Sequence, residues 1–412
     1  MPAVRLAARW VLRVDAPPIA AGAVLIGADG RIVTVGPDTG VPAPPDVPRR
    51  TFPSAAIAPG FVNTHTHLEL TGFEGQVESD DFAAWIRRLR ELKDQRPPEE
   101  YLAAALRGVR DAWAAGVTTV ADTGDRGVVI RALTVCGGSG VAYQEVFGPH
   151  PDQTSESLAQ LQAKVTELRA FESARVRLGV SPHAPYTVSG PLYRAVSAYA
   201  RSEGLPLAVH LAESPAETQL LGAGAGPFAD AWVRRGIPLP SLPGRSPVAW
   251  LDRHGVLGPQ TLCIHVVQVD AEDIARLAGA GVGVAHCPVS NRRHGHGDAP
   301  LGALLAAGLR VGVGTDSVAS VGCLDLLAEA RAARSLAGLS WDDALALVTR
   351  GGGRALGLEG EVGSLAAGKW GDAVIIRLRG GESPAEQVMN SGTEAVVATY
   401  VGGRQVFEGA GA

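Results

Sequence analysis

Short apolar runs alternate with helical segments along the middle of this 412-residue chain, and this pattern restricts the possible folds strongly. The runs are continuously apolar, as strands buried on both faces of a parallel sheet are. Eight strands are predicted, at residues 55–62, 117–121, 141–146, 176–180, 207–211, 261–266, 281–285 and 310–314. Eight strand–helix units in series predict an α/β fold, a (β/α)8 TIM barrel. The alternative is an open doubly wound sheet, but no Gly-x-Gly-x-x-Gly follows the first strand.

Both ends of the chain have a different pattern, with short strands separated by tight turns. Strands are predicted at residues 4–14, 22–26 and 31–35, and again at 373–377, 395–401 and 404–407. We predict that residues 1–55 and 366–412 pair into one small β-sandwich domain, while residues 56–365 form the barrel. Two unrelated extensions are the alternative. Residues 214–260 are rich in Gly and Pro, which predicts a long loop over the barrel mouth or an irregular surface connection.

Histidine or aspartate occurs at the carboxyl ends of six of the eight predicted strands. In a (β/α)8 barrel this end holds the active site, so these side chains are predicted to converge there. His65 and His67 are spaced by one residue, so they point to the same side of a strand, and two converging imidazoles suit a transition metal. The remaining members, in chain order, are His183, His210, His265, His286 and Asp316.

Several of these residues also have a structural interpretation. Asp316 could cap the following helix, His183 could be a turn residue between two prolines, and His286 could only pack and form hydrogen bonds. His210, at a buried strand end, could be a satisfied core histidine. Four other histidines lie in loop-like contexts and are interpreted as structural: His150, His254, His294 and His296.

Longer motifs surround these residues and carry a family resemblance. They are Pro59-Gly-Phe-Val-Asn-Thr-His-Thr-His67, Ser181-Pro-His-Ala-Pro-Tyr186, His210-x-x-Glu213, His286-Cys-Pro-x-Ser-Asn291, Gly314-Thr-Asp-Ser317 and Gly363-Ser-Leu-Ala-Ala-Gly-Lys-Trp-Gly-Asp372. Over nearly its whole length the chain resembles the amidohydrolase superfamily. The branch concerned is that of the mononuclear-metal deaminases and chlorohydrolases, which act on cytosine, guanine, S-adenosylhomocysteine and chlorotriazines.

The resemblance implies a role for each matching residue. One divalent metal ion, Zn2+ with Fe2+ or Mn2+ as alternatives, would be held by His65, His67, His210 and Asp316. The metal would lower the pKa of a water molecule towards about 7. Glu213 would take the proton of this water and return it to a ring nitrogen, His265 would orient the water, and Asp316 would carry the second proton. Residues 175–181 contain no lysine, which favours one metal because binuclear members use a carboxylated lysine there.

Two segments resemble deaminases of adenine nucleosides. Around His183 the chain is similar to adenosine-type deaminases, in which this histidine contacts the nucleoside. Residues 65–71 are similar to a subset assigned to aminodeoxyfutalosine deamination. The expected reaction is therefore hydrolytic deamination of 6-amino-6-deoxyfutalosine to futalosine and ammonia, on the futalosine route to menaquinone. The alternatives are S-adenosylhomocysteine or methylthioadenosine deamination, a chlorohydrolase and a ring amidohydrolase. Glu213 and Glu69 are also predicted to contact the substrate, although Glu69 could instead be an internal salt-bridge or hydrogen-bond partner.

Charge and cysteine usage narrow the expected partners and compartment. The formal net charge is −5 without a block of like charges, which argues against nucleic acid. No stretch approaches the roughly 20 apolar residues of a membrane-spanning helix, and no signal peptide is evident. The four cysteines form no Cys-x-x-Cys and are interpreted as buried thiols of a cytoplasmic protein. We expect a small-molecule substrate and a possible homodimer. A barrel that only binds or serves as a structural subunit is disfavoured by Glu213 and Asp316.

Overall fold

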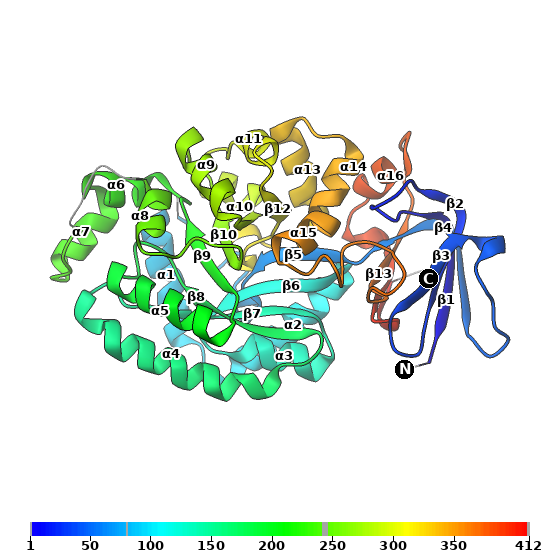
Figure 1. Cartoon of the computed structure of the whole chain (residues 1–412), viewed down its shortest axis with the longest axis horizontal. Helices are drawn as coiled ribbons and strands as arrows, with labels where there is room; N and C mark the ends of the chain where they lie inside the picture. The colour runs from blue at the N-terminus through cyan, green and yellow to red at the C-terminus, as the bar shows by residue number, and fades with distance from the viewer. Residues whose placement is uncertain (1, 80, 241–245, 410–412) are drawn as a thin grey trace.

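A computed structural model describes residues 2–79, 81–240 and 246–409 of the chain. It contains two sheets, one of eight parallel strands and one of seven strands, which lie side by side (Figure 1). The eight-stranded sheet runs in chain order and closes on itself, because Thr66 at its first strand forms a parallel bridge with Asp316 after its last. The predicted (β/α)8 barrel is therefore confirmed.

The barrel strands are short and almost entirely buried, as their continuously apolar sequences predict. Their bounds are β5 Phe61–Thr66, β6 Val117–Gly124, β7 Gly140–Val146, β8 Val176–Pro182, β9 Leu207–Leu211, β10 Thr261–His265, β11 Gly283–His286 and β12 Arg310–Val313. Seven of the eight predicted strands coincide with these within a few residues. The carboxyl ends of all eight strands consequently meet at one mouth of the barrel.

The first predicted strand, residues 55–62, is wrong in its boundaries. Residues 55–59 belong to β4 (Arg49–Pro59) of the other sheet, and the barrel strand β5 begins only at Phe61. Gly60 separates the two, and a Cβ atom there would lie 2.2 Å from Oγ1 of Thr118. Only glycine lets the chain pass from one sheet to the other at this point.

Helices cover the outside of the barrel (Figure 1). The larger ones are α2 Pro98–Ala114, α3 Val128–Cys136, α4 Thr154–Leu168, α5 Gly190–Glu203, α9 Ala271–Ala280 and α13 Leu326–Ala337. Short helices complete it: α10 Pro288–Arg293, α11 Leu301–Ala306, α12 Val318–Val321 and α16 Pro384–Met389. A π turn at Leu347–Gly351 lies between α14 Trp341–Ala346 and α15 Gly352–Ala355. The Ser340 hydroxyl caps the start of α14, since it accepts a hydrogen bond from Asp343 N (3.1 Å).

The seven-stranded sheet is built from both ends of the chain, in the order β15-β14-β13-β4-β1-β2-β3. Its remaining strands are β1 Val4–Val11, β2 Ile19–Ile26, β3 Ile32–Pro37, β13 Ala373–Arg377, β14 Val396–Val401 and β15 Arg404–Glu408. It has a separate apolar core, in which Leu6 and Ile57 from one end of the chain pack with Ile375 and Tyr400 from the other. The predicted pairing of the two ends is confirmed.

Residues 214–260 were predicted to form a loop or irregular connection, and this prediction is wrong for most of the segment. It contains three helices, α6 Pro215–Ala223, α7 Gly226–Arg234 and α8 Pro247–Arg253, while residues 241–245 lie outside the described part of the chain. Each helix has a proline in its first turn, and α6 ends at Gly224 with φ of 62°. The prolines and glycines that suggested a loop are therefore helix boundaries.

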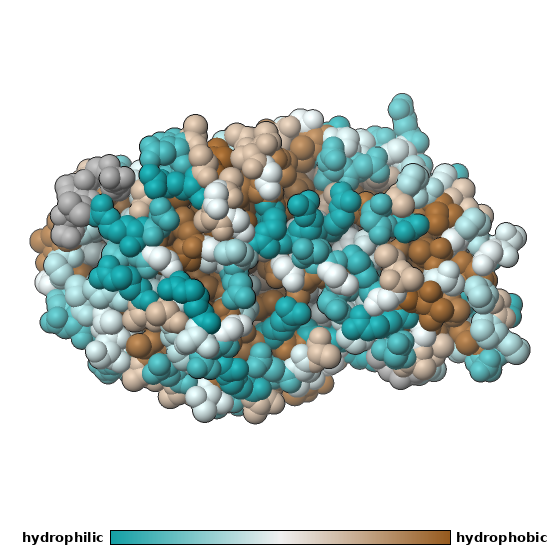
Figure 2. Space-filling view, viewed as in Figure 1, coloured by the Kyte–Doolittle hydropathy of each residue, from teal (hydrophilic) through white to brown (hydrophobic). Residues whose placement is uncertain are grey.

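Polar side chains cover much of the barrel on the face shown in Figure 2, while apolar side chains gather over the seven-stranded sheet. Within the described ranges, the structure has no helix long and apolar enough to span a bilayer. All four cysteines are free, but only Cys263 and Cys287 are buried. Cys136 is half-buried and Cys323 is exposed, so the expectation of four buried thiols is wrong for these two.

Candidate metal centre and active site

A cavity of about 460 Å³ opens at the carboxyl ends of the barrel strands. Six of the residues singled out by the sequence line it, and they come from strands far apart in the chain: His67, His183, His210, Glu213, His265 and Asp316. Apolar side chains of α1 (Phe82–Gln95), including Phe82, Trp85 and Leu89, form another part of its wall.

His65, His67 and Asp316 form the tightest group of donor atoms at the base of this cavity. Oδ1 of Asp316 lies 3.5 Å from Nε2 of His65 and 3.4 Å from Nε2 of His67. Two ligands of a tetrahedral metal with bonds of 2.0–2.1 Å lie about 3.3 Å apart, so the spacing matches. His65 is fully buried, and neither of its ring nitrogens has a hydrogen-bond partner among the described residues. Its Nε2, the nitrogen that faces Asp316, fits a divalent cation.

The other predicted ligand, His210, faces the same point. Its Nδ1 lies 3.1 Å from the carbonyl oxygen of His183, and Nδ1 of His67 lies 3.3 Å from Oγ1 of Thr123. These contacts hold each ring so that Nε2 is left for a cation, as is usual for histidine ligands. The ring centroids of His65 and His210 are 4.9 Å apart. The residues therefore present a set of nitrogen and oxygen donors that could hold a metal.

The backbone is strained where it carries these side chains. His265 and Asp316 have φ angles of 71° and 61°, values that non-glycine residues rarely adopt. The amide of Asp316 donates to the carbonyl oxygen of His65 (3.0 Å), and a Cβ atom on Gly314 would lie 2.6 Å from His65 N. The end of β12 can therefore approach β5 only because position 314 is glycine. Strain of this kind is typical of functional sites.

Glu213 lies on the cavity wall next to His265, with Oε1 at 3.5 Å from Nε2 of that histidine. Its Oε2 accepts a hydrogen bond from the Tyr186 hydroxyl (3.4 Å). Burial, followed by the negative charges of Asp316 and Glu217, raises the pKa of Glu213 well above its usual value. Glu217 accepts hydrogen bonds from the amides of Ala212 (2.8 Å) and Glu213 (3.0 Å), which fixes this turn. A buried carboxyl group with a raised pKa on the cavity wall can exchange a proton with a molecule bound in the cavity.

His265 and Asp316 differ in charge state, since the first is neutral and the second is ionised. Burial lowers the pKa of His265 well below its usual value, so its imidazole is neutral, and Nδ1 is held by Oδ1 of Asn291 (2.9 Å). Burial alone would raise the pKa of Asp316, but the nearby His65 and His67 outweigh it and the pKa falls well below the usual range. Asp316 therefore stays ionised, and its Oδ2 accepts from the Ser290 hydroxyl (2.7 Å).

Two predicted site residues occupy different surroundings. His183 lines the cavity, with Nδ1 2.8 Å from Oγ1 of Thr187. His286 does not line it, because its ring is buried and its Nδ1 contacts the carbonyl oxygen of His265 (3.0 Å), as its structural interpretation requires.

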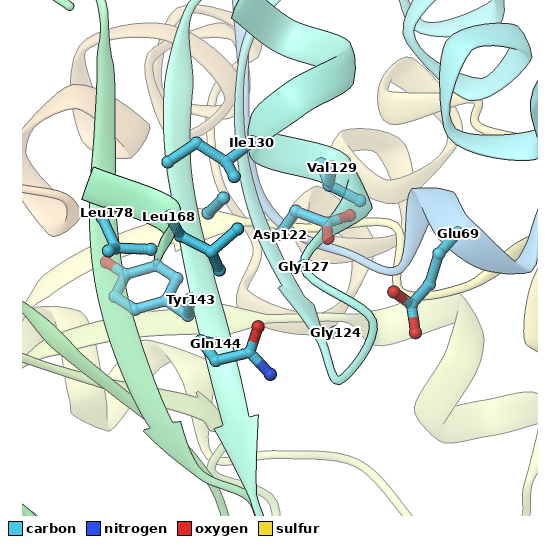
Figure 3. Close-up of a pocket in the computed structure, with 11 residues that line it drawn as sticks. Glu69, Asp122, Gly124, Gly127, Val129, Ile130, Tyr143, Gln144, Leu168 and Leu178 are labelled. Carbon is cyan, nitrogen blue, oxygen red and sulfur yellow. The ribbon is translucent and has the colours of Figure 1, made fainter. Parts of the chain in front are cut away.

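Glu69, for which a contact with substrate was predicted, is not among the residues that line the large cavity. It belongs to a 3-10 turn, Leu68–Leu70, that follows β5. Its buried carboxylate lies 3.6 Å from the Lys93 ammonium and accepts from the amide of Arg126 (3.3 Å). Figure 3 shows Glu69 and Asp122 among the residues that line a small pocket, together with Gly124, the last residue of β6. The internal salt bridge, left open by the sequence, is the observed arrangement.

Several residues at the cavity were not found from the sequence. Glu145 ends β7 and follows the same strand-end rule as the histidines, which could have identified it. Lys93 comes from α1 and carries no such signal. His294 and His296 were interpreted as structural, yet His294 lines the cavity and Nδ1 of His296 lies 3.6 Å from Oε1 of Glu213.

Comparison with known proteins gives a consistent result. An aminodeoxyfutalosine deaminase from Deinococcus radiodurans is 37% identical over 354 residues, 80% of this chain and 81% of the relative. A 5-methylthioadenosine/S-adenosylhomocysteine deaminase from Moorella thermoacetica is 31% identical, covering 90% of this chain and 84% of the relative. The zinc-containing crystal structure of an adenosine deaminase from Xanthomonas campestris has the same fold, with a TM-score of 0.85 at 24% identity over 98% of this chain and 92% of that one.

The sequence also matches the Amidohydrolase family over residues 56–406, a range that includes the whole barrel and every residue of the donor cluster. This match and the identity to the Deinococcus relative extend over most of the chain. The chain belongs to the amidohydrolase family, and it is a hydrolase that acts on C–N bonds.

Proposed function

We propose that this chain catalyses the metal-dependent hydrolytic deamination of an adenine-type nucleoside, with 6-amino-6-deoxyfutalosine as its substrate. The observation that carries the proposal is the convergence of Glu213, His265 and Asp316 beside the donor cluster on one wall of the cavity. The higher identity to the aminodeoxyfutalosine deaminase, 37% against 31% for the methylthioadenosine/S-adenosylhomocysteine deaminase, favours this substrate. Product futalosine would enter menaquinone synthesis.

The metal in this proposal is one Zn2+ ion, held by His65, His67, His210 and Asp316. When bound, zinc acts as a Lewis acid that lowers the pKa of water to about 7. The donor set of three imidazoles and one carboxylate suits zinc, although Fe2+ and Mn2+ accept the same ligands. Zinc in the structurally similar adenosine deaminase supports this choice.

Three residues would move or orient protons. Glu213, whose pKa burial raises, would take a proton from the attacking water and pass it to a ring nitrogen of the purine. His265 is neutral and fixed through Asn291, so its Nε2 would orient that water. Asp316 would carry the second proton to the departing ammonia.

The cavity wall would hold the nucleoside. His183 and Phe147 lie with ring centroids 5.0 Å apart at one side, and Phe82 and Trp85 form a stacked pair at another. Aromatic faces of this kind stack on purines, and the Nε2 atom of His183 is free to bond to a hydroxyl group.

The test is a panel of adenine nucleosides given to metal-loaded protein, with the adenine-to-hypoxanthine absorbance change and released ammonia measured for each. The proposal expects kcat/KM for 6-amino-6-deoxyfutalosine to exceed that for methylthioadenosine and S-adenosylhomocysteine by at least about tenfold, or ~1.4 kcal/mol. A preference for S-adenosylhomocysteine would make the second candidate correct, and absence of ammonia from every nucleoside would remove the proposal.

A further inference from the structure

Glu145 and His183 face each other across the floor of the cavity, beside the donor cluster. They lie at the ends of the neighbouring strands β7 and β8, where Glu145 is paired in register with Ser181. Oε1 of Glu145 is 4.0 Å from Nε2 of His183. Together with His210 these residues offer three ligand atoms that all lie within 4.8 Å of one another. This group is separate from the one formed by His65, His67 and Asp316.

One oxygen of the buried Glu145 carboxyl group lacks a hydrogen bond. Its side chain is 4% exposed, and Oε1 has no hydrogen-bond partner among the described residues. An unpartnered buried carboxylate is costly unless a cation or a proton reaches it. Glu145 is one of the residues that line the cavity, and its buried Oε1 lies on the side of His183, 4.0 Å from Nε2.

His183 is held as a metal-binding histidine would be. Its Nδ1 lies 2.8 Å from Oγ1 of Thr187, which leaves Nε2 directed at Glu145. Metal-ligating histidines commonly have the second ring nitrogen fixed by such a contact. The separation of 4.0 Å is slightly wider than the about 3.3 Å between tetrahedral ligands, so a small rotation of the Glu145 side chain would bring both to one cation.

The charge around this pair also favours a cation. Three carboxyl groups, those of Glu69, Asp125 and Glu145, act on the ammonium group of Lys93, and Arg126 lies 3.6 Å from Asp125. Three carboxylates against two cations leave one net negative charge when all are ionised, and the carboxyl group of Asp122 also acts on Glu145. Burial and these neighbouring carboxyl groups raise the pKa of Glu145 well above its usual value despite Lys93, so a cation that binds there displaces a proton.

We propose that Glu145 and His183 form a second, weaker binding site for a divalent transition-metal ion, and that an excess of zinc occupies it and blocks the cavity. His210 belongs to the first centre, so the second site has only two ligands of its own and fills after the first. An ion between Glu145 and His183 would occupy space that the nucleoside needs. Inhibition by this ion rests on the proposed deaminase function, whereas its binding does not.

The experiment is a zinc titration of metal-free protein by equilibrium dialysis, with metal counted per chain. Wild-type protein is expected to bind one ion tightly and a second at higher free zinc, whereas Glu145→Gln binds only the first. Asp94→Asn, which changes another carboxyl group of the same cavity, serves as the matched control and retains both. His183→Gln is a second test variant should Glu145→Gln fail to fold, and it too is expected to lose the second ion.

A kinetic readout accompanies the binding data. Excess zinc should inhibit wild-type ammonia release competitively with the nucleoside, and residual activity of Glu145→Gln should be insensitive to the same excess. A single ion per wild-type chain at saturating zinc, or a second ion kept by both Glu145→Gln and His183→Gln, would overturn the proposal. Two bound ions in a protein that deaminates no nucleoside would instead contradict only the proposed function.

Discussion

Two clusters of buried titratable side chains lie at the barrel mouth and satisfy their polar atoms in different ways. In the first, the donor cluster of His65, His67, His210 and Asp316, both ring nitrogens of His65 lack a hydrogen-bond partner within the described chain. In the second, which we call the lysine cluster, Glu69 and Asp125 lie 3.6 and 3.0 Å from the Lys93 ammonium.

The difference distinguishes a ligand-binding site, the donor cluster, from a group of side chains that stabilises the fold, the lysine cluster. Leaving an imidazole nitrogen buried and unpaired costs free energy, and a cation bound at Nε2 of His65 recovers the cost for that nitrogen. The lysine cluster contains its own cation, and Glu69 also accepts hydrogen bonds from the amides of Asp125 (3.4 Å) and Arg126 (3.3 Å). It therefore needs no external partner and fixes α1 against the barrel. Substitutions in the donor cluster should therefore change metal binding and activity, whereas substitutions in the lysine cluster should change stability.

The largest effect is expected from the double variant His65→Asn/His67→Asn. Removing two of four nitrogen and oxygen donors should abolish binding of the tightly held ion, and ammonia release should fall more than about 1,000-fold because several kcal/mol of Lewis-acid stabilisation disappear. Tightly bound metal by elemental analysis and initial rates would be measured on the same preparations. Stoichiometric, tightly bound metal in the double variant would show that the donor cluster is not the metal site.

Glu213→Gln should lower kcat by about 10²–10⁴-fold, since the amide can neither accept nor deliver the proton. Metal content should remain that of the wild type, which distinguishes loss of proton transfer from loss of the ion. Retention of most of the wild-type activity would remove Glu213 from the proton path, even if the double histidine variant behaved as expected.

Lys93→Met should change stability rather than metal binding. It leaves the carboxylates of Glu69 and Asp125 buried without their cation, and breaking such a pair costs about 3 kcal/mol of the free energy of unfolding. Urea unfolding would measure the loss. Adding Glu69→Gln should recover part of it, because one of the uncompensated charges is then removed. Loss of bound metal in folded Lys93→Met would contradict the separation of the two clusters.

Much of the barrel and of the donor cluster could be predicted because both follow one rule, that strand ends meet at one mouth. Apolar runs such as 207–211 identify buried strands directly, and His210 and His265 then take their places at the strand ends. The boundary at Gly60 could not be found, because β4 and β5 read as one apolar run although they belong to different sheets.

The lysine cluster could not be predicted for a related reason. Its members come from a helix, a 3-10 turn and a loop, whose packing depends on tertiary contacts rather than on a repeat in the sequence. Glu69 illustrates the limit, since the chain leaves the strand after Thr66 and the alternation that relates His65 to His67 does not extend to Glu69. His296 was set aside for its loop context, and that loop returns to Glu213.

The smallest expected effect on stability comes from His254, a histidine that lies outside both the donor cluster and the lysine cluster. Its Nδ1 lies 2.7 Å from Nη1 of Arg194, and burial, with Arg194 and Arg253, lowers its pKa from 6.5 to about 4. Between pH 6.5 and pH 4 His254 binds a proton in the unfolded chain but not in the folded chain. The free energy of unfolding that depends on His254 is therefore fully present above pH 6.5 and falls as the pH drops towards 4.

His254→Gln should reduce this dependence of stability on pH relative to wild type, while metal content and turnover at neutral pH stay unchanged. Urea unfolding across this pH range measures the slope. Because the comparison is a difference from wild type, the other histidines cancel. An unchanged dependence of stability on pH would mean that the folded chain does not lower the pKa of His254. A loss of metal would mean that His254, although it is paired with Arg194, also affects the metal centre.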